Sequence, residues 1–286
     1  MTDIVREVSV LGQELRVSVR PGAGRPLVLC NGIGASLDLL GPFVDALDPA
    51  IPVVRFDVPG VGGSPPPNRP YTFATLARRL GALLDQLGHD TVDVLGISWG
   101  GALAQQFAFQ NPLRCQKLVL VSTATGFLMV PAHPRVLGRM LTPRRYVDPE
   151  YAALVAAELY GGQLRKDPSL VATLLDGHSR RPSPRGYALQ LCAGLGWTSL
   201  PFLPLIRQPT LLLAGDDDPI IRLANAKIMR RLLPNATLYV YPDGHLGLIT
   251  RAAELAPVVA DFLRPAPAPG EGSSRPSTSG PPRSTS

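Results

Sequence analysis

A serine flanked by glycines is the clearest sign of chemistry in this sequence. Gly96-Ile-Ser-Trp-Gly100 holds Ser98 with a glycine two positions away on either side, and Gly101 follows. A serine hydroxyl becomes a useful nucleophile only when a neighbouring base takes its proton. Glycines at these positions remove the crowding around a serine held on a tight turn between a strand and a helix. The segment predicts Ser98 as a nucleophile; the alternative is a glycine-rich turn whose serine only caps the helix.

The general base is expected to be a histidine, and the chain has four. Where this serine motif serves catalysis in an α/β-hydrolase fold, the chain order is serine, acid, histidine. His89 precedes Ser98, while His133 and His178 lie in an irregular central segment. Only His245 follows a late apolar run, within Tyr241-Pro-Asp-Gly-His245. His245 is therefore the predicted base, and the alternative is an ordinary histidine on a surface loop.

Three adjacent aspartates are candidates for the acid that orients the base. Asp216, Asp217 and Asp218 follow an apolar run, and one carboxylate there would accept the imidazole N–H and stabilise the imidazolium. The spacing G-x-x-D, common in folds of this type, favours Asp218. Asp217 stays open as an alternative, and Asp216 as a weaker one, because three neighbouring acids cannot all point inward.

Two backbone N–H groups are needed to stabilise an oxyanion. One is expected from Trp99, directly after the nucleophile, and the other from Ile33 in Asn31-Gly-Ile-Gly34. A second glycine-rich segment, Asp57–Ser64, lacks the lysine of a phosphate-binding loop. We interpret that segment as a structural turn near the site.

The order of apolar runs predicts which elements position these residues. Two alternating strands, Ile4–Val10 and Glu14–Val19, are joined by a turn at Leu11-Gly12. Short apolar runs then alternate with amphipathic stretches such as Thr72–Leu87 and Ala102–Gln110, a pattern typical of a mostly parallel sheet flanked by helices. The runs are Leu27–Cys30, Val53–Phe56, Val92–Leu95, Lys117–Val121, Thr210–Ala214 and Thr237–Tyr241.

The alternation stops between the fourth and fifth of these central runs. Residues 125–208 are too long for a loop and contain prolines throughout, so we expect a helical cap inserted into a core formed by residues 1–124 and 209–263. Pro149–Tyr160 and Ser169–His178 have helical patterns. Apolar cap residues such as Trp197, Phe202 and Leu203 would form a core of the cap or the wall of a substrate cleft. Residues 264–286 are mostly Pro, Ser, Gly and Thr and are expected to be disordered.

Composition excludes several classes of protein. Cys30, Cys115 and Cys192 are odd in number and far apart, which argues against disulfides or a metal site and favours a reducing, cytoplasmic setting. The N-terminus does not resemble a signal peptide, and no apolar run is long enough to span a membrane. The net charge of +6 arises mainly in the cap, with ten basic and five acidic side chains, but no nucleic-acid-binding motif accompanies it.

The motifs together resemble one family within the α/β-hydrolase superfamily, the intracellular depolymerases of medium-chain-length polyhydroxyalkanoates. The resemblance covers roughly residues 25–263, and the motifs in the cap narrow it to this family. The matching segments are Asn31-Gly-Ile-Gly-Ala35, Phe56-Asp-Val-Pro-Gly-Val-Gly-Gly-Ser64, Gly96-Ile-Ser-Trp-Gly-Gly-Ala-Leu-Ala-Gln-Gln-Phe107, Pro143-Arg-Arg-Tyr-Val147, Tyr160-Gly-Gly162, Ala193-Gly-Leu-Gly-Trp-Thr-Ser199, Ala214-Gly-Asp-Asp-Asp-Pro219 and Asp243-Gly-His-Leu246.

The resemblance implies a serine esterase that hydrolyses a polyester to 3-hydroxy acids without a cofactor or metal. It implies Ser98, Asp218 and His245 as the catalytic triad. It also implies that the protein acts at the surface of cytoplasmic storage granules, where other granule-associated proteins are possible partners. Two further hypotheses stay open. One keeps the fold with another substrate, as in a general esterase, a lipase or a carbon–carbon bond hydrolase; the other is a non-catalytic granule-binding protein.

Overall fold

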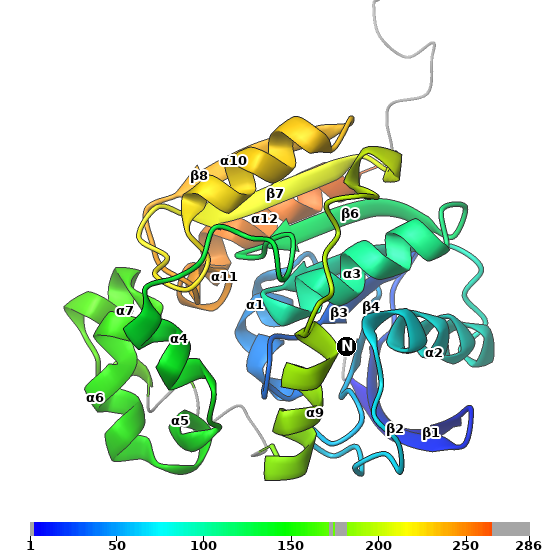
Figure 1. Cartoon of the computed structure of the whole chain (residues 1–286). Coiled ribbons are helices and arrows are strands. Elements are labelled where there is room, and N and C mark those ends of the chain that lie inside the picture. Colours follow the sequence, from blue (N-terminus) through cyan, green and yellow to red (C-terminus); the bar gives the residue numbers. More distant parts are fainter. Residues whose placement is uncertain (1–2, 172–173, 175–181, 265–286) are drawn as a thin grey trace, which may run out of the picture.

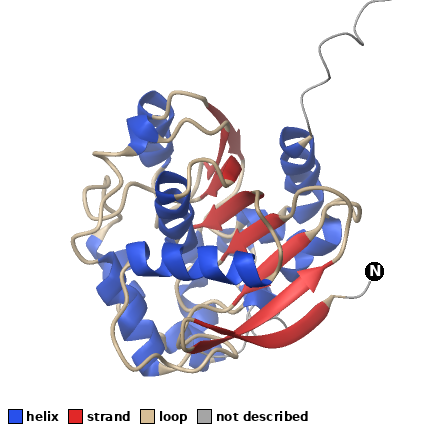
Figure 2. Ribbon diagram, turned by 90° about the vertical axis from the view of Figure 1, so that its right-hand side faces the viewer, coloured by secondary structure: helices blue, strands red, loops and turns tan. Residues whose placement is uncertain are grey.

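A computed structural model of the chain describes residues 3–171, 174 and 182–264. Its centre is an eight-stranded sheet in the order β1-β2-β4-β3-β5-β6-β7-β8 (Figures 1 and 2). β2 pairs antiparallel with β1 and β4, and the other neighbouring strands are parallel, which confirms the predicted mostly parallel sheet. The strands are β1 (Ile4–Val10), β2 (Gln13–Arg20), β3 (Leu27–Cys30), β4 (Val53–Phe56), β5 (Val92–Ile97), β6 (Cys115–Val121), β7 (Thr210–Gly215) and β8 (Ala236–Tyr241).

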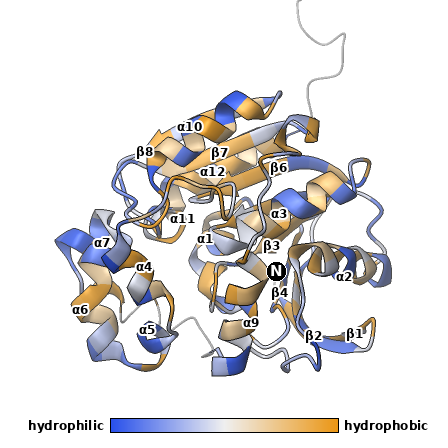
Figure 3. Ribbon diagram, in the orientation of Figure 1, coloured by the Kyte–Doolittle hydropathy of each residue, from blue (hydrophilic) through white to orange (hydrophobic). Residues whose placement is uncertain are grey.

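Each central strand has buried side chains on both faces, which explains its continuous apolar run. Leu27 and Leu29 of β3 join one hydrophobic cluster, whereas Val28 and Cys30 join another. Successive side chains of a strand point to opposite faces of the sheet, so the two clusters lie on opposite sides. In Figure 3, β7 is coloured as hydrophobic over most of its length, and α10, which packs on it, alternates between the two colours.

Helices cover both faces of the sheet. The cluster containing Leu27 also contains residues of α1 (Gly41–Ala46), α11 (Gly247–Thr250) and α12 (Ala252–Leu263). The opposite cluster contains residues of α2 (Phe73–Gln86), α3 (Trp99–Gln110) and α10 (Leu223–Leu232), with its C-cap Leu233. Two short 3₁₀ helices, η1 (Leu37–Leu40) and η2 (Leu203–Leu205), precede α1 and β7.

The ends of two predicted helices show how local chemistry sets a boundary. α2 lies within the predicted Thr72–Leu87: the Thr72 side chain accepts a hydrogen bond from the Thr75 backbone N–H, and Leu87 is the C-cap. The predicted start of α3 at Ala102 was wrong by three residues. The helix begins at Trp99, immediately after Ser98, because the strand turns into the helix without an intervening loop.

The described part of the segment between β6 and β7 contains several helices, as predicted, and lies beside the sheet in Figure 1. We keep the name cap for residues 125–208; these limits stay a prediction. α6 matches the predicted Pro149–Tyr160, whereas the predicted helix Ser169–His178 lies mostly outside the described residues. The helices are α4 (Pro134–Met140), α5 (Arg144–Val147), α6 (Pro149–Tyr160), α7 (Gly162–Lys166) and α9 (Pro184–Gly194).

Apolar cap residues extend the core of the sheet domain. Val155 and Leu159 of α6 belong to the same cluster as Leu27 of β3, while Ala193 of α9 belongs to the cluster on the opposite face. The cap therefore straddles the sheet edge instead of packing on one side. Across the described ranges, no helix combines the length and apolar character needed to cross a bilayer. The predicted disordered tail, apart from Arg264, falls outside the part that the structure describes.

Candidate active site

Ser98 occupies the junction between β5 and α3 in a strained backbone conformation. Its φ of 54° lies in the left-handed region, which is unfavourable for a non-glycine residue. The Ser98 backbone N–H donates to the Val121 carbonyl at 2.9 Å, and the Thr123 hydroxyl donates to the Ser98 carbonyl at 2.7 Å. These contacts hold the serine where the strand ends and the first free N–H groups of the helix begin.

The glycines around Ser98 are required by close contacts. A Cβ on Gly96 would lie 2.4 Å from the Gly100 carbonyl oxygen, and one on Gly100 would lie 2.1 Å from the Cys30 carbonyl oxygen. A Cβ on Gly101 would lie 2.3 Å from the Thr123 hydroxyl oxygen. The predicted reason for the glycine spacing therefore applies here, since larger residues would force the turn apart.

His245 and Asp218 form a buried hydrogen-bonded pair. His245 Nδ1 lies 2.8 Å from Asp218 Oδ2, and both residues are almost completely buried. The other carboxylate oxygen of Asp218 accepts the backbone N–H groups of Ile220 and Ile221 at 2.9 and 2.8 Å. Asp218 is thus fixed in orientation, and His245 Nε2 is left to face a second partner.

The other two aspartates point elsewhere. Asp217 forms a two-point ion pair with Arg165 of α7, with both N–O distances at 2.9 Å, and accepts the Gly162 N–H. The hydrogen bond from Arg165 lowers the pKa of Asp217, although burial opposes it. Asp216 is exposed. Of the three candidates, Asp218 is the one that the structure brings to His245.

The loop that carries His245 is held by the junction between α6 and α7. The His245 backbone N–H donates to the Tyr160 carbonyl at 2.7 Å. A Cβ on Gly162 would lie 1.8 Å from Asp243 Oδ1, so the two segments approach each other too closely for any side chain at position 162. Asp243 Oδ1 also accepts the Gln163 N–H at 2.8 Å. Sequence reasoning found this junction only as a matching motif, because nothing local indicates its contact 80 residues away.

The loop predicted to stabilise an oxyanion lies beside Ser98. A Cβ on Gly32 would lie 3.6 Å from the Ser98 Cβ, an ordinary contact distance. The Ile33 carbonyl accepts the Tyr146 hydroxyl at 2.7 Å, and the Gly34 N–H donates to Gln190 at 2.7 Å. Cap side chains therefore fix this loop. Within the described residues, the N–H groups of Ile33 and Trp99 have no acceptor.

The segment Asp57–Ser64 has the structural role that we inferred for it. Asp57 is buried and accepts the N–H groups of Leu37 and Gly63 at 2.6 and 2.8 Å. Arg16 lies 3.3 Å from the same carboxylate. Burial raises the pKa of Asp57, so these donors are what keep the group compatible with the interior.

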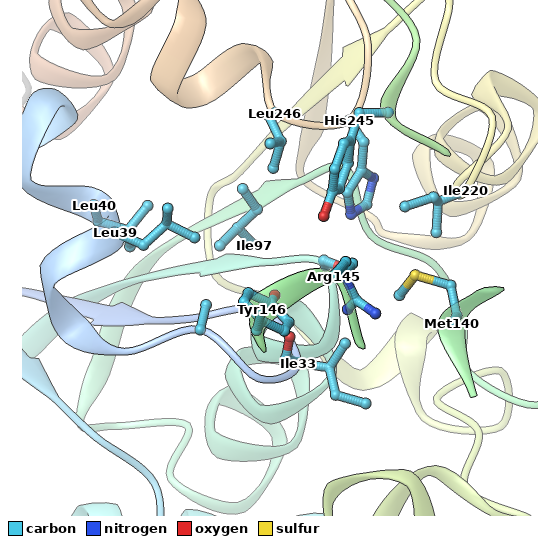
Figure 4. Close-up of a pocket in the computed structure, with 14 residues that line it drawn as sticks. Ile33, Leu39, Leu40, Ile97, Met140, Arg145, Tyr146, Ile220, His245 and Leu246 are labelled. Atoms are coloured by element: carbon cyan, nitrogen blue, oxygen red, sulfur yellow. The ribbon is translucent and has the colours of Figure 1, made fainter. Parts of the chain in front are cut away.

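Ser98 lines two pockets. The first, which we call the His245 pocket, is lined by Ser98, His245, Arg145 and Tyr146 together with apolar side chains (Figure 4). The second, the Trp197 pocket, is lined by Ser98, Trp99 and Trp197 and by further, mostly apolar residues, and has a cavity volume of about 340 Å³. Within the described chain the Ser98 hydroxyl has no hydrogen-bond partner, and such bonds often tighten only when substrate is bound.

Sequence reasoning missed Arg145 and Tyr146 as pocket residues. In Figure 4 they reach the space below His245 from the cap, on the side opposite the β8–α11 loop. Two signals were available: the matching segment Pro143–Val147, and the pair Arg144-Arg145 in a basic segment, which predicts a solvated surface as readily as a buried site. Only the fold distinguishes the two arginines: Arg145 is buried, while Arg144 is exposed and pairs with Asp148.

No group of three or more His, Cys, Asp or Glu side chains is placed to hold a metal ion in the described parts of the chain. The cysteines there are free. Burial raises the pKa of Cys30 to about 12, so its thiol stays protonated and does not act as a nucleophile beside Ser98.

The fold and the site together match a known family. The family model described as "alpha/beta hydrolase fold" matches residues 25–252. The chain therefore belongs to the alpha/beta hydrolase fold family. The solved enol-lactonase from Burkholderia xenovorans LB400 aligns with a TM-score of 0.77 and 25% sequence identity, covering 90% of this chain and 99% of that one.

Within this family, one relative agrees in name with the resemblance drawn from the motifs. A poly(3-hydroxyalkanoate) depolymerase from Ectopseudomonas oleovorans is 51% identical over 91% of this chain and 93% of that protein, which confirms the resemblance to polyhydroxyalkanoate depolymerases. A pimeloyl-[acyl-carrier protein] methyl ester esterase from Aromatoleum aromaticum is 33% identical over 83% of this chain and 98% of its own length.

Proposed function

We propose that this protein is a serine esterase that hydrolyses medium-chain-length polyhydroxyalkanoate to 3-hydroxy acids at the surface of cytoplasmic granules. The observation that carries the proposal is the position of Ser98, which lines one pocket with the Asp218-paired His245 and another with apolar side chains. The 51% identity to a protein named as a depolymerase supports the choice of a polyester as substrate.

The proposed reaction has two steps through an acyl-enzyme. His245 takes the proton of Ser98 as its oxygen attacks an ester carbonyl, and the N–H groups of Trp99 and Ile33 stabilise the oxyanion. Asp218 holds the imidazole and stabilises its positive charge. His245 then protonates the leaving alcohol, and water, activated in the same way, hydrolyses the acyl-enzyme.

The preference for medium-length side chains rests on the Trp197 pocket. Its walls are almost entirely apolar and include Phe73, Met129 and Leu137 besides the two tryptophans. Each methylene group that a substrate buries there contributes about 0.8 kcal/mol. A longer alkyl side chain on the polyester would therefore gain more from this pocket than a methyl group.

The decisive test is hydrolysis of isolated polyester granules. Wild-type protein is incubated with medium-chain granules and, in parallel, with short-chain granules, and the released acid is titrated. We expect release from the medium-chain granules, and a loss of about 10⁴-fold or more in Ser98→Ala. No release by wild type, or equal release by the variant with its melting temperature unchanged, would refute the proposal.

A second candidate function is hydrolysis of small esters. The relative from Aromatoleum aromaticum, which is named as a methyl ester esterase, favours it. A series of p-nitrophenyl esters of increasing acyl length, assayed beside the granules, separates the two: efficient turnover of esters with none of granules supports the small-ester enzyme. Failure of a fluorophosphonate probe to label Ser98 would instead support a non-catalytic binding protein.

A further inference from the structure

Arg145 is a buried cation in the His245 pocket without a carboxylate partner in the described parts of the chain. The residue is 3% exposed and belongs to α5 of the cap. Its Nη1 donates to the Tyr187 hydroxyl at 2.9 Å and to the Thr142 carbonyl at 3.2 Å, and its guanidinium lies 4.6 Å from the centroid of the Tyr146 ring. Its Nε is buried with no hydrogen-bond partner.

This arrangement favours an anion. A guanidinium stays protonated in proteins, and burying a charge without an opposite charge is costly. Although burial opposes the charge, the tyrosines around it raise the pKa of Arg145. The remaining walls of the His245 pocket include Leu39, Ile97 and Met140, so an entering carboxylate would find one strong partner.

The two pockets have different positions relative to the base. Ser98 lines both, but His245 lines only the pocket that contains Arg145. When Ser98 becomes acylated, the oxygen of the departing alcohol must receive a proton from His245. The leaving group therefore lies on the His245 side of Ser98. The acyl part, with the rest of the chain, is then directed to the Trp197 pocket.

Building on the proposed function, we infer that Arg145 binds the free carboxylate at the end of a polyester chain, so that the enzyme removes one terminal 3-hydroxy acid at a time. In the terminal unit only two carbon atoms separate the carboxylate from the ester oxygen. A carboxylate held by Arg145 therefore places that ester oxygen near His245, within the pocket that both residues line.

Acylation of Ser98 and hydrolysis of the acyl-enzyme need no reactant other than water. The Ser98 oxygen bonds to the carbonyl carbon of the penultimate unit, the bond from that carbon to the ester oxygen breaks, and His245 gives the Ser98 proton to the departing oxygen. The terminal 3-hydroxy acid leaves with its carboxylate. Water then releases the chain from Ser98, which creates a new terminal carboxylate on a chain one unit shorter.

The test compares a dimer of 3-hydroxyoctanoate bearing a free carboxylate with the same dimer bearing a terminal primary amide, as the ratio of kcat/KM on one preparation of enzyme. A ratio cancels any loss of folded protein in a variant. We expect wild type to prefer the free acid about 10- to 100-fold, and Arg145→Gln to lose that preference. Arg145→Lys should keep part of it. Arg144→Gln is the matched control, because Arg144 is exposed on the same helix, and it should keep all of it.

The outcomes separate this inference from the proposed function. If wild type hydrolyses both dimers equally, or if Arg145→Gln keeps the wild-type ratio, Arg145 only braces the cap and the inference is wrong. If wild type hydrolyses neither dimer nor granules, the proposed function itself fails. Early products from granules give an independent check: monomer from the first time point supports removal from the end, and an initial burst of oligomers overturns it.

Discussion

The sheet and the cap obey different rules, although both contribute to the same pockets. Strands such as β3 and β7 are buried on both faces, so their apolar runs are visible in the sequence. Two of the cap helices are short, with four residues in α5 and five in α7, and helices of this length are stable only through tertiary contacts. The loops of the sheet carry Ser98 and His245, the proposed reacting groups, whereas residues of the cap line the pockets around them.

The comparison teaches that the proposed reacting residues can be recognised from local sequence signals, whereas the residues proposed to set specificity cannot. Ser98 and His245 follow the ends of strands, where parallel strands bring distant residues to one edge. Arg145 and Trp197 come from segments whose position depends on the whole fold. Variants in the two regions should therefore fail in different ways, and the following predictions test that difference.

The largest effect on kcat is expected from Asp218, the proposed triad acid, which follows strand β7. Asp218→Asn should lower kcat on p-nitrophenyl octanoate about 10⁴-fold, because the amide holds the imidazole in the wrong tautomer. Asp217→Asn is the matched control and should lose less than about tenfold, because its carboxylate pairs with the half-exposed Arg165. Stopped assays on both purified variants decide; equal losses would mean that the two aspartates are not distinguished as the geometry indicates.

A smaller effect is expected where the cap meets the loop of His245. In Gly162→Ala the added methyl group must displace Asp243, two residues before His245, and kcat should fall about 10²-fold through misplacement of the base. Circular dichroism and the melting temperature check that the variant folds. Wild-type kcat in a folded Gly162→Ala protein would show that the cap does not position the base.

Glycines in the two regions should respond in opposite directions. Gly100→Ala in the sheet domain should lower the free energy of unfolding by about 1–3 kcal/mol, because its Cβ meets the Cys30 carbonyl. Gly138→Ala in α4 meets nothing within 4 Å and should raise it by about 0.5–1 kcal/mol. Denaturant titrations measure both, and stabilisation of the first variant would contradict the close packing described around Ser98.

The smallest effect is expected in the wall of the Trp197 pocket. Phe127 is 67% exposed but lines this pocket, so Phe127→Ala should lower kcat/KM about tenfold for octanoyl esters, through lost apolar contact, and leave acetyl esters unchanged. The ratio of the two esters is the measurement. An equal loss on octanoyl and acetyl esters would mean that Phe127 affects the reaction itself and not the binding of the acyl chain. That result would contradict the distinction drawn between sheet and cap.

Much of the sheet domain could be predicted because its signals are local. The apolar runs predict six strands closely: the limits of β1, β3 and β4 match at both ends, and those of β2, β7 and β8 match to within one residue. The predicted turn at Leu11-Gly12 joins β1 and β2, and both of its residues have positive φ. The order of Ser98 and His245 relative to the strands also predicted that they lie close together, and both line the His245 pocket. The start of α3 was misplaced because the glycines after Ser98 resemble a loop and instead allow close packing.

The rest could not be predicted because it depends on contacts between distant segments. Nothing in the sequence near Asp217 indicates that it forms an ion pair with Arg165, and nothing near Arg145 indicates that its guanidinium lies against Tyr187. In the cap, only the long α6 has a pattern strong enough to predict its limits. Which side chains point into a pocket is decided after the cap has packed on the sheet.

The shared core has a consequence for how the protein melts. Ala152, Val155 and Leu159 of the cap lie in one apolar cluster with Phe43 and Leu255 of the sheet domain. A cap with this attachment is not a separable lid. Unfolding it alone would open a strip of apolar surface to water, so cap and sheet should denature as a single cooperative unit, and a truncated chain lacking the cap would tend to self-associate.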